Sequence, residues 1–139
     1  MMIDRTCRTP RVLCIDDDPG VTSAIEAGLS RYDVEVQTAY FGTQGIWQAI
    51  NFPPDIIITD LRMPRGKGDY VVECLKGRED TADIPVIVLT GRRNIEMKRW
   101  MLALGVKYYL HKPISMQKLV QIIGRTIELS PRRPNFQAV

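Results

Sequence analysis

The stretch that decides the fold is residues 55–64, DIIITDLRMP, where a run of apolar and β-branched residues leads directly into Asp60. The run does not alternate between polar and apolar side chains, so it predicts a strand covered on both faces, as the strands of a parallel sheet are. Ligands of such sheets bind in the crevice beyond the carboxyl ends of the strands. Asp60 stands at that end, which makes it the first candidate for chemistry.

Length and composition fit one domain with a single core, because the chain has 139 residues and 45% of them are hydrophobic. A net charge of +3 permits an acidic partner or nucleic acid but requires neither. The three cysteines lack the spacing of a metal site and predict free thiols in a reducing compartment. No run approaches the length of a signal-peptide core or of a membrane span. We therefore predict a cytoplasmic protein without membrane contact.

Apolar runs and helical patterns alternate along the chain. Strands are expected at residues 11–15, 34–39, 56–59, 85–90 and 106–111, and helices at 19–31, 42–52, 69–77, 94–105 and after Ser115. The alternation predicts an α/β domain of the flavodoxin-like (βα)5 class, a doubly wound parallel five-stranded sheet with the expected order 2-1-3-4-5. We place this domain at residues 11–129, between a disordered or extended N-terminus (1–10) and a C-terminal tail or linker (130–139).

Three single residues carry local expectations. Asp69 is expected to cap the helix at 69–77. Trp100 falls between two methionines of the helix at 94–105, and it is expected to pack in the core, with a partner contact as the alternative. His111 is the only histidine, and we assign it a structural role rather than one as ligand, base or phosphoacceptor.

Functional groups end four of the five expected strands, namely Asp16 and Asp17, Asp60, Thr90 and Lys112. In a parallel sheet these ends meet at one edge. Three carboxylates crowded there repel one another and need a cation, and an all-oxygen ligand set suits Mg²⁺ far better than zinc. Carboxylate, divalent metal, ammonium and hydroxyl together are the equipment of phosphoryl transfer, with Asp60 as the nucleophile.

The motifs that carry a family resemblance are Asp16-Asp17 after the first strand, Asp60 with Met63-Pro64 after the third, Thr90-Gly91 after the fourth and Lys112-Pro113 after the fifth. Each motif alone is weak, but all of them in this order are highly specific. Over residues 11–129 the chain resembles the receiver domain of two-component response regulators.

The resemblance implies that Asp60 accepts a phosphoryl group from a sensor histidine kinase or a histidine phosphotransfer protein. It implies a Mg²⁺ site, with Mn²⁺ as an alternative ion, formed by Asp17, Asp60, Asp16 through water, and the backbone carbonyl of Arg62. Lys112 and Thr90 would bind the phosphoryl oxygens. The domain would be no enzyme beyond self-phosphorylation from small phosphodonors and autodephosphorylation.

The resemblance also implies a switch. Thr90 and Tyr109 would move inward on phosphorylation and change protein contacts across the face of the fourth helix, fifth strand and fifth helix. A dimer that forms through the same face is also possible. The downstream protein is unknown. Direct binding of nucleic acid by this domain is not expected, and the Lys112–Pro113 bond would be cis.

Two arginines depart from a typical site. Arg62 and Arg92 stand two residues after Asp60 and Thr90, at positions that tune dephosphorylation in the family. Two guanidinium groups beside a phosphoryl group would pair with it and shield it from water. We therefore predict a long-lived phosphoform.

Three other functions share part of this sequence pattern. The chain could be the N-terminal receiver part of a longer regulator with a DNA-binding or enzymatic output domain. A Mg²⁺-dependent phosphohydrolase with an aspartyl-phosphate intermediate would need a general acid two residues after the nucleophile, where Arg62 stands. A flavodoxin-like mononucleotide binder would need a phosphate-binding loop after the first strand, where Asp16, Asp17 and Asp18 stand.

Overall fold

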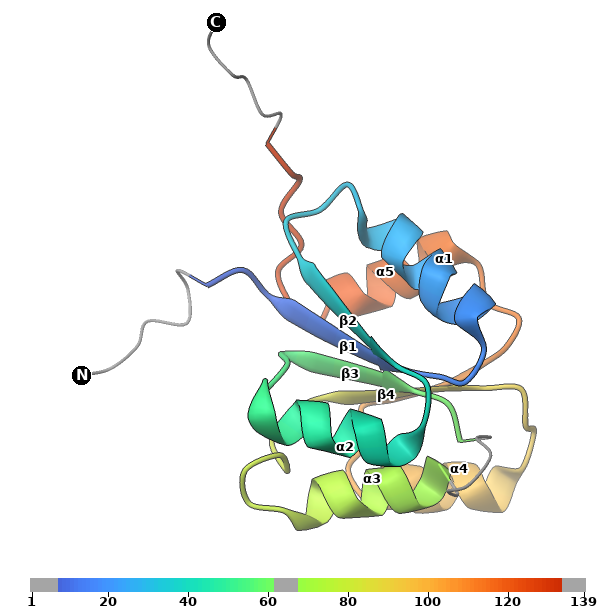
Figure 1. The fold of residues 1–139 in the computed structure, drawn as a ribbon. Helices are drawn as coiled ribbons and strands as arrows, with labels where there is room; N and C mark the ends of the chain where they lie inside the picture. The colour runs from blue at the N-terminus through green and yellow to red at the C-terminus, as the bar shows by residue number, and fades with distance from the viewer. Residues whose placement is uncertain (1–7, 62–67, 134–139) are drawn as a thin grey trace, which may run out of the picture.

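The structure of the chain is a computed structural model that describes residues 8–61 and 68–133 (Figure 1). Its strands and helices alternate along the chain. They are β1 (Arg11–Ile15), α1 (Pro19–Leu29), β2 (Glu35–Ala39), α2 (Gly42–Asn51), β3 (Ile56–Thr59), α3 (Gly68–Gly77), β4 (Val86–Thr90), α4 (Ile95–Ala103), β5 (Tyr108–His111) and α5 (Met116–Gly124).

The five strands form one parallel sheet in the order β2-β1-β3-β4-β5, so the predicted flavodoxin-like fold and strand order are confirmed. Helices α1 and α5 cover one face of the sheet, and α2, α3 and α4 cover the other (Figure 1). Strand β2 lies at an edge, which explains why only Ala39 of its five residues is fully buried.

Two apolar clusters, one on each face of the sheet, make up the core. Alternate residues of β1 supply both: Leu13 and Ile15 pack with α2 and α3, whereas Val12 and Cys14 pack with α1 and α5. Side chains of a strand point alternately to opposite faces, so a strand buried on both faces needs an unbroken apolar run. This requirement is why the sequence pattern identified β1, β3 and β4 correctly.

Helix ends follow the predicted signals, with one exception. The Asp18 carboxylate accepts a hydrogen bond from the Gly20 N–H and caps α1, and the Ser115 hydroxyl accepts one from the Lys118 N–H at the start of α5. Gly105, with φ of 105°, follows α4 in the conformation that favours glycine. The prediction for Asp69 is wrong, because α3 begins at Gly68 and a capping residue must precede the first helical residue.

The prediction that Trp100 packs in the core is also wrong, since this side chain is 38% exposed. Met101 fills the position in α4 that faces the sheet and is fully buried. Successive residues of a helix are rotated by about 100°. Trp100 therefore lies on the flank of α4, although it directly precedes a core residue.

The first residues after the predicted domain boundary contact the domain. The Asp33 N–H donates to the Ser130 carbonyl at 2.7 Å, and the Arg132 N–H donates to the Arg31 carbonyl at 2.8 Å. Between them Tyr32 and Pro131 form an antiparallel bridge. Within the two stretches that the structure describes, no helix is long and apolar enough to cross a membrane.

Candidate functional site

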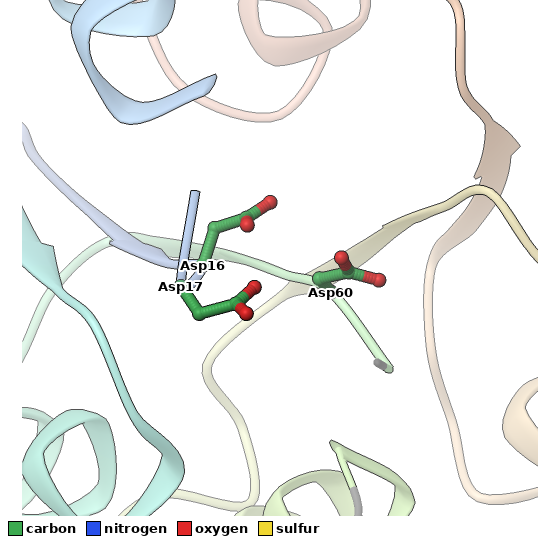
Figure 2. Close-up of side chains that lie close together, drawn as sticks. All are labelled: Asp16, Asp17 and Asp60. Carbon is green, nitrogen blue, oxygen red and sulfur yellow. The ribbon is translucent and has the colours of Figure 1, made fainter. Parts of the chain in front are cut away.

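The site begins with three carboxylates beyond the ends of two neighbouring strands (Figure 2). In the register of the sheet Ile15 of β1 is paired with Thr59 of β3, so the next residues, Asp16 and Asp60, emerge side by side. Carboxylate oxygens of Asp16, Asp17 and Asp60 all lie within 4.8 Å of one another. Asp16 and Asp60 are buried, whereas Asp17 is exposed to solvent.

A single ammonium group bridges the two buried carboxylates. Lys112 Nζ donates to Asp16 Oδ2 at 2.9 Å and to Asp60 Oδ2 at 3.0 Å. The Lys112 N–H donates to the Thr90 carbonyl at 2.8 Å, which fixes the start of this side chain just after β5, and the following Lys112–Pro113 bond is cis as expected. The long side chain of Lys112 thus reaches across the strand ends to the acids.

The charges of the cluster act on its pKa values. Burial raises the pKa of Asp16, and the negative charge of Asp60 adds to this, against the Asp18 N–H and Lys112, which lower it. Burial lowers the pKa of Lys112, but hydrogen bonds to Asp16 and Asp60 and their charges together outweigh burial, so its pKa is raised. At neutral pH the lysine is therefore a firmly charged cation.

Thr90 and Tyr109 lie on the β4–β5 side of this cluster. Thr90 is fully buried, and its Oγ1 accepts a hydrogen bond from the Arg92 N–H at 3.1 Å. The Tyr109 side chain is also buried, and within residues 8–61 and 68–133 its hydroxyl has no hydrogen-bond partner. Its ring meets the His111 ring edge-on at 5.6 Å.

Burial raises the pKa of the Tyr109 hydroxyl, the charge of Arg92 opposes this, and the charge of Asp60 adds to it. The charges of Arg92 and Asp60 thus act on the pKa of this hydroxyl in opposite directions. Arg92 itself is exposed. Arg62, predicted as a metal ligand through its carbonyl and as a modulator of the phosphoform, lies outside the described residues.

The donor set fits a hard divalent cation. Three carboxylates supply only oxygen, and Mg²⁺ prefers a few carboxylates together with water, whereas zinc prefers nitrogen and sulfur. The exposed Asp17 leaves one side of the cluster open to solvent, so an ion reaching it could keep part of its water shell.

The sequence placed the right residues at one edge of the sheet, but two features of the site were not predicted from it. It assigned Lys112 to a phosphoryl group and did not foresee that Lys112 pairs with Asp16 and Asp60 beforehand. It also did not foresee that the Tyr109 hydroxyl is buried and has no hydrogen-bond partner in the described part of the chain. The signal for the first was present, because a lysine among three acids at one sheet edge has few other partners.

The comparisons with known proteins agree with this geometry. Residues 12–124 match the family described as the response regulator receiver domain. The chain belongs to the response regulator receiver domain family. The resemblance seen in the sequence is thus confirmed, and this receiver domain has a signalling fold rather than that of a classical enzyme family.

Curated relatives of this receiver domain include both regulators and kinases. RpaA of Synechocystis, named as a DNA-binding dual master transcriptional regulator, is 34% identical over 125 residues, which cover 90% of this chain and 52% of RpaA. PrrA of Mycobacterium tuberculosis, named as a transcriptional regulatory protein, is 36% identical over 85% of this chain and 50% of PrrA. Hybrid signal transduction histidine kinase D of Dictyostelium discoideum is 38% identical over 80% of this chain and 7% of the kinase.

The receiver domain spans about half the length of the two regulators and a small part of the kinase. Solved structures match it over nearly their whole length. The chemotaxis protein CheY4 of Vibrio cholerae is 26% identical with a TM-score of 0.79, and the match covers 86% of this chain and all of CheY4.

Proposed function

We propose that Asp60 is the phosphoacceptor of this receiver domain and that its phosphoryl group comes from a sensor histidine kinase or a histidine phosphotransfer protein. The observation that carries the proposal is the Lys112 ammonium, held at 3.0 Å from Asp60 in a cluster of three carboxylates. An Asp60 oxygen forms a bond to phosphorus while the bond from phosphorus to the donor's nitrogen breaks. The electron pair of that bond stays on the nitrogen, which then takes a proton.

Asp17 and Asp60 are the residues that we assign to Mg²⁺, with Asp16 acting through water and the carbonyl of Arg62 completing the site. Their support is the all-oxygen donor set within 4.8 Å. Mn²⁺ would fit the same donors. Bound at this site, the ion supplies positive charge to the oxygens of the transferring phosphoryl group.

Lys112 has two successive roles in this proposal. Before transfer its single positive charge offsets part of the negative charge of Asp16 and Asp60 and holds the Asp60 carboxylate in place. After transfer Asp60 carries the phosphoryl oxygens, and Lys112 binds them as a fixed cation. Because its pKa is raised, the ammonium keeps its proton in both states.

Thr90 and Tyr109 form the proposed switch. Thr90 Oγ1 is a hydrogen-bond acceptor for the Arg92 N–H, so its own hydroxyl proton can be donated to a phosphoryl oxygen. A new charge on Asp60 also changes the field at the Tyr109 hydroxyl. We infer that these shifts alter protein contacts across α4, β5 and α5 by changing the populations of two states.

A second possibility, favoured by one observation, is that this chain is the receiver part of a longer regulator. RpaA and PrrA, both named as regulators of transcription, are about twice as long as the matched region. In that case residues 11–129 are the receiver, residues from 130 lead toward a further domain, and DNA is bound outside this domain. Under either reading we propose action in the cytoplasm, on a downstream protein that this chain does not identify.

Intact mass spectrometry with acetyl phosphate and Mg²⁺ tests the proposal. The parent should gain the mass of one phosphoryl group, and it should gain none when EDTA removes the metal. Asp60→Asn should remain unlabelled. Asp18→Asn is the matched control, because asparagine also caps a helix, and it should label like the parent. Labelling of Asp60→Asn at the parent's rate would refute the assignment.

A further inference from the structure

Helix α2 and the segments that flank it contain no charged residue from position 36 to position 54, although 25% of the chain is charged. A surface helix of a monomeric protein normally carries charged or polar residues on its outer face. Charge depletion with aromatic enrichment is instead the signature of the core of a protein interface. The polar residues of α2 are all uncharged, so this segment lacks the charged side chains of an ordinary solvated helix.

The fully buried positions of α2 hold small residues, whereas its largest side chain, that of Trp47, is exposed. Gly42, Gly45 and Ala49 are its buried residues, and a Cβ added at Gly45 would collide with the Ile15 side chain. Trp47, in contrast, is 57% exposed. Burying glycine against the sheet while tryptophan faces solvent gives little stability to an isolated domain, because the apolar area of the large ring stays in water.

The exposed aromatic side chains gather beside a hollow between α2 and α3. Trp47 and Phe52 meet edge-to-face at 5.9 Å, and Tyr70 of α3, which is 54% exposed, lines the hollow together with Trp47. The hollow has a volume of about 570 Å³, and Ile46 and Ile50 form part of its lining. We call the surface of Trp47, Phe52, Tyr70 and this hollow the α2–α3 face.

The spacing on this face suits another pair of helices. On α2 the lining residues Thr43, Trp47 and Ile50 follow one another at intervals of four and three, and α3 repeats the pattern with Tyr70, Cys74 and Gly77. Such a stripe is the packing surface of helix bundles. Because α2 and α3 lie side by side on the same face of the sheet, the two stripes form one surface (Figure 1).

We propose that the α2–α3 face binds the same face of a second copy of this chain, so that α2 and α3 of two copies pack as a four-helix layer around a two-fold axis. The face carries both a protruding ring and a hollow next to it, which makes it self-complementary, as an isologous contact requires.

The charges support a second copy rather than a charged partner. Among the residues that the structure describes, Glu73 and Arg78 are the charged residues that line the hollow, and they have opposite signs. These two charges sum to zero, so they do not repel the same face of a second copy, and each can meet the opposite charge of that copy across a two-fold axis. A partner with charge of one sign would meet a like charge here as well as an opposite one.

The surface area that the exposed aromatic rings can bury indicates the size of the expected dimer contact. A whole aromatic side chain buries about 150–250 Å², so three rings that are half exposed contribute about 300 Å² per copy. A standard interface buries about 800 Å² on each side. A contact centred on this face is therefore small, and we expect a weak, reversible dimer.

Sedimentation velocity of the unphosphorylated chain tests the proposal independently of the proposed function. Its two tryptophans give a matched pair of variants, because Trp47 lies on the α2–α3 face and the exposed Trp100 lies on α4. From about 1 µM to about 1 mM the parent should shift from monomer to dimer. Trp47→Glu should weaken dimerisation at least about tenfold, and Trp100→Glu should behave like the parent.

Two further measurements keep the test decisive. If Trp47→Glu loses its circular dichroism spectrum, Thr43→Glu, an exposed change on the same stripe, takes its place. In Trp100→Phe the emission of the remaining Trp47 should move to shorter wavelength as the dimer forms. A parent that stays monomeric over the whole range, or a dimer that Trp100→Glu breaks and Trp47→Glu does not, would overturn the proposal.

Discussion

Lys112 Nζ lies 3.0 Å from Asp60 Oδ2, although 52 positions separate the two residues in the chain. The same ammonium reaches Asp16 Oδ2 at 2.9 Å. One cation therefore holds together the ends of β1 and β3 and the segment that follows β5. The ion-paired cluster thus links three segments that lie far apart in the sequence.

Removing this cation should destabilise the domain. Lys112→Met leaves Asp16 and Asp60 buried without their shared partner, and we expect a loss of about 3 kcal/mol in the free energy of unfolding at pH 7, at the low end for a broken buried ion pair because the Lys112 side chain is 25% exposed. Urea denaturation measures the loss. The exposed Lys107→Met is the control, with an expected change within about 0.5 kcal/mol. Equal stability of the two variants would contradict the bridging role.

Alkaline pH should reveal the burial of Cys14. Burial, with smaller contributions from Glu26 and Asp16, raises the pKa of its thiol from 9.0 to about 12. A raised folded-state pKa means that stability is complete below pH 9.0 and is lost as pH rises toward about 12. Between pH 8 and pH 10 the parent should lose about 1.4 kcal/mol more unfolding free energy than Cys14→Ala. Urea denaturation at both pH values decides this, and parallel losses in the two proteins would mean that the thiol titrates normally.

Much of the fold was predictable because the pattern of apolar residues in a strand shows which of its faces are buried. The runs at β1, β3 and β4 are apolar throughout since both of their faces are covered. The acids that follow β1 and β3 had to meet, because parallel strands end at one edge. It was therefore enough to know that Asp16, Asp17 and Asp60 directly follow predicted strands in order to predict that they lie close together.

Features that depend on which way one side chain points were not predictable. Trp100 and Met101 are adjacent in sequence, yet only Met101 faces the sheet. The outward face of α2 likewise depends on glycines that let the helix approach Ile15, a contact between segments far apart in sequence. Which two of the three carboxylates pair with Lys112 depends on the path of a flexible side chain, and no periodicity of the sequence records that path.

Tyr109→Phe should stabilise the unphosphorylated domain. The mutation removes a buried hydroxyl that has no hydrogen-bond partner among the described residues, and relief of its desolvation penalty should add about 1 kcal/mol to the free energy of unfolding. Tyr108→Phe is the matched control on the opposite face of the sheet, and it should change stability little. Thermal or urea unfolding compares the two. A loss of stability in Tyr109→Phe would show that the hydroxyl has a partner.

A glycine pair tests the close approach of α2 to the sheet. Gly45→Ala places a Cβ against the Ile15 side chain in the core, and we expect a loss of about 1–3 kcal/mol. Gly77→Ala, at the end of α3, meets nothing within 4 Å and should gain up to about 1 kcal/mol from the higher helix propensity of alanine. Urea denaturation should thus give changes of opposite sign. Equal effects would mean that α2 moves away from the sheet at little cost.

Arg92 should lengthen the life of the phosphoform. Arg92 stands two residues after Thr90 and its N–H donates to the Thr90 hydroxyl, so we expect its guanidinium to pair with a phosphoryl group on Asp60 and to exclude water from it. Loss of one partly exposed charge contact of about 1 kcal/mol would speed hydrolysis about fivefold in Arg92→Ala. The half-life of the labelled protein after removal of acetyl phosphate measures this, with the exposed neighbour Arg93→Ala as control. If Arg92→Ala keeps its label as long as Arg93→Ala or longer, Arg92 does not protect the phosphoryl group, and any slow hydrolysis has its cause in Arg62 or elsewhere in the site.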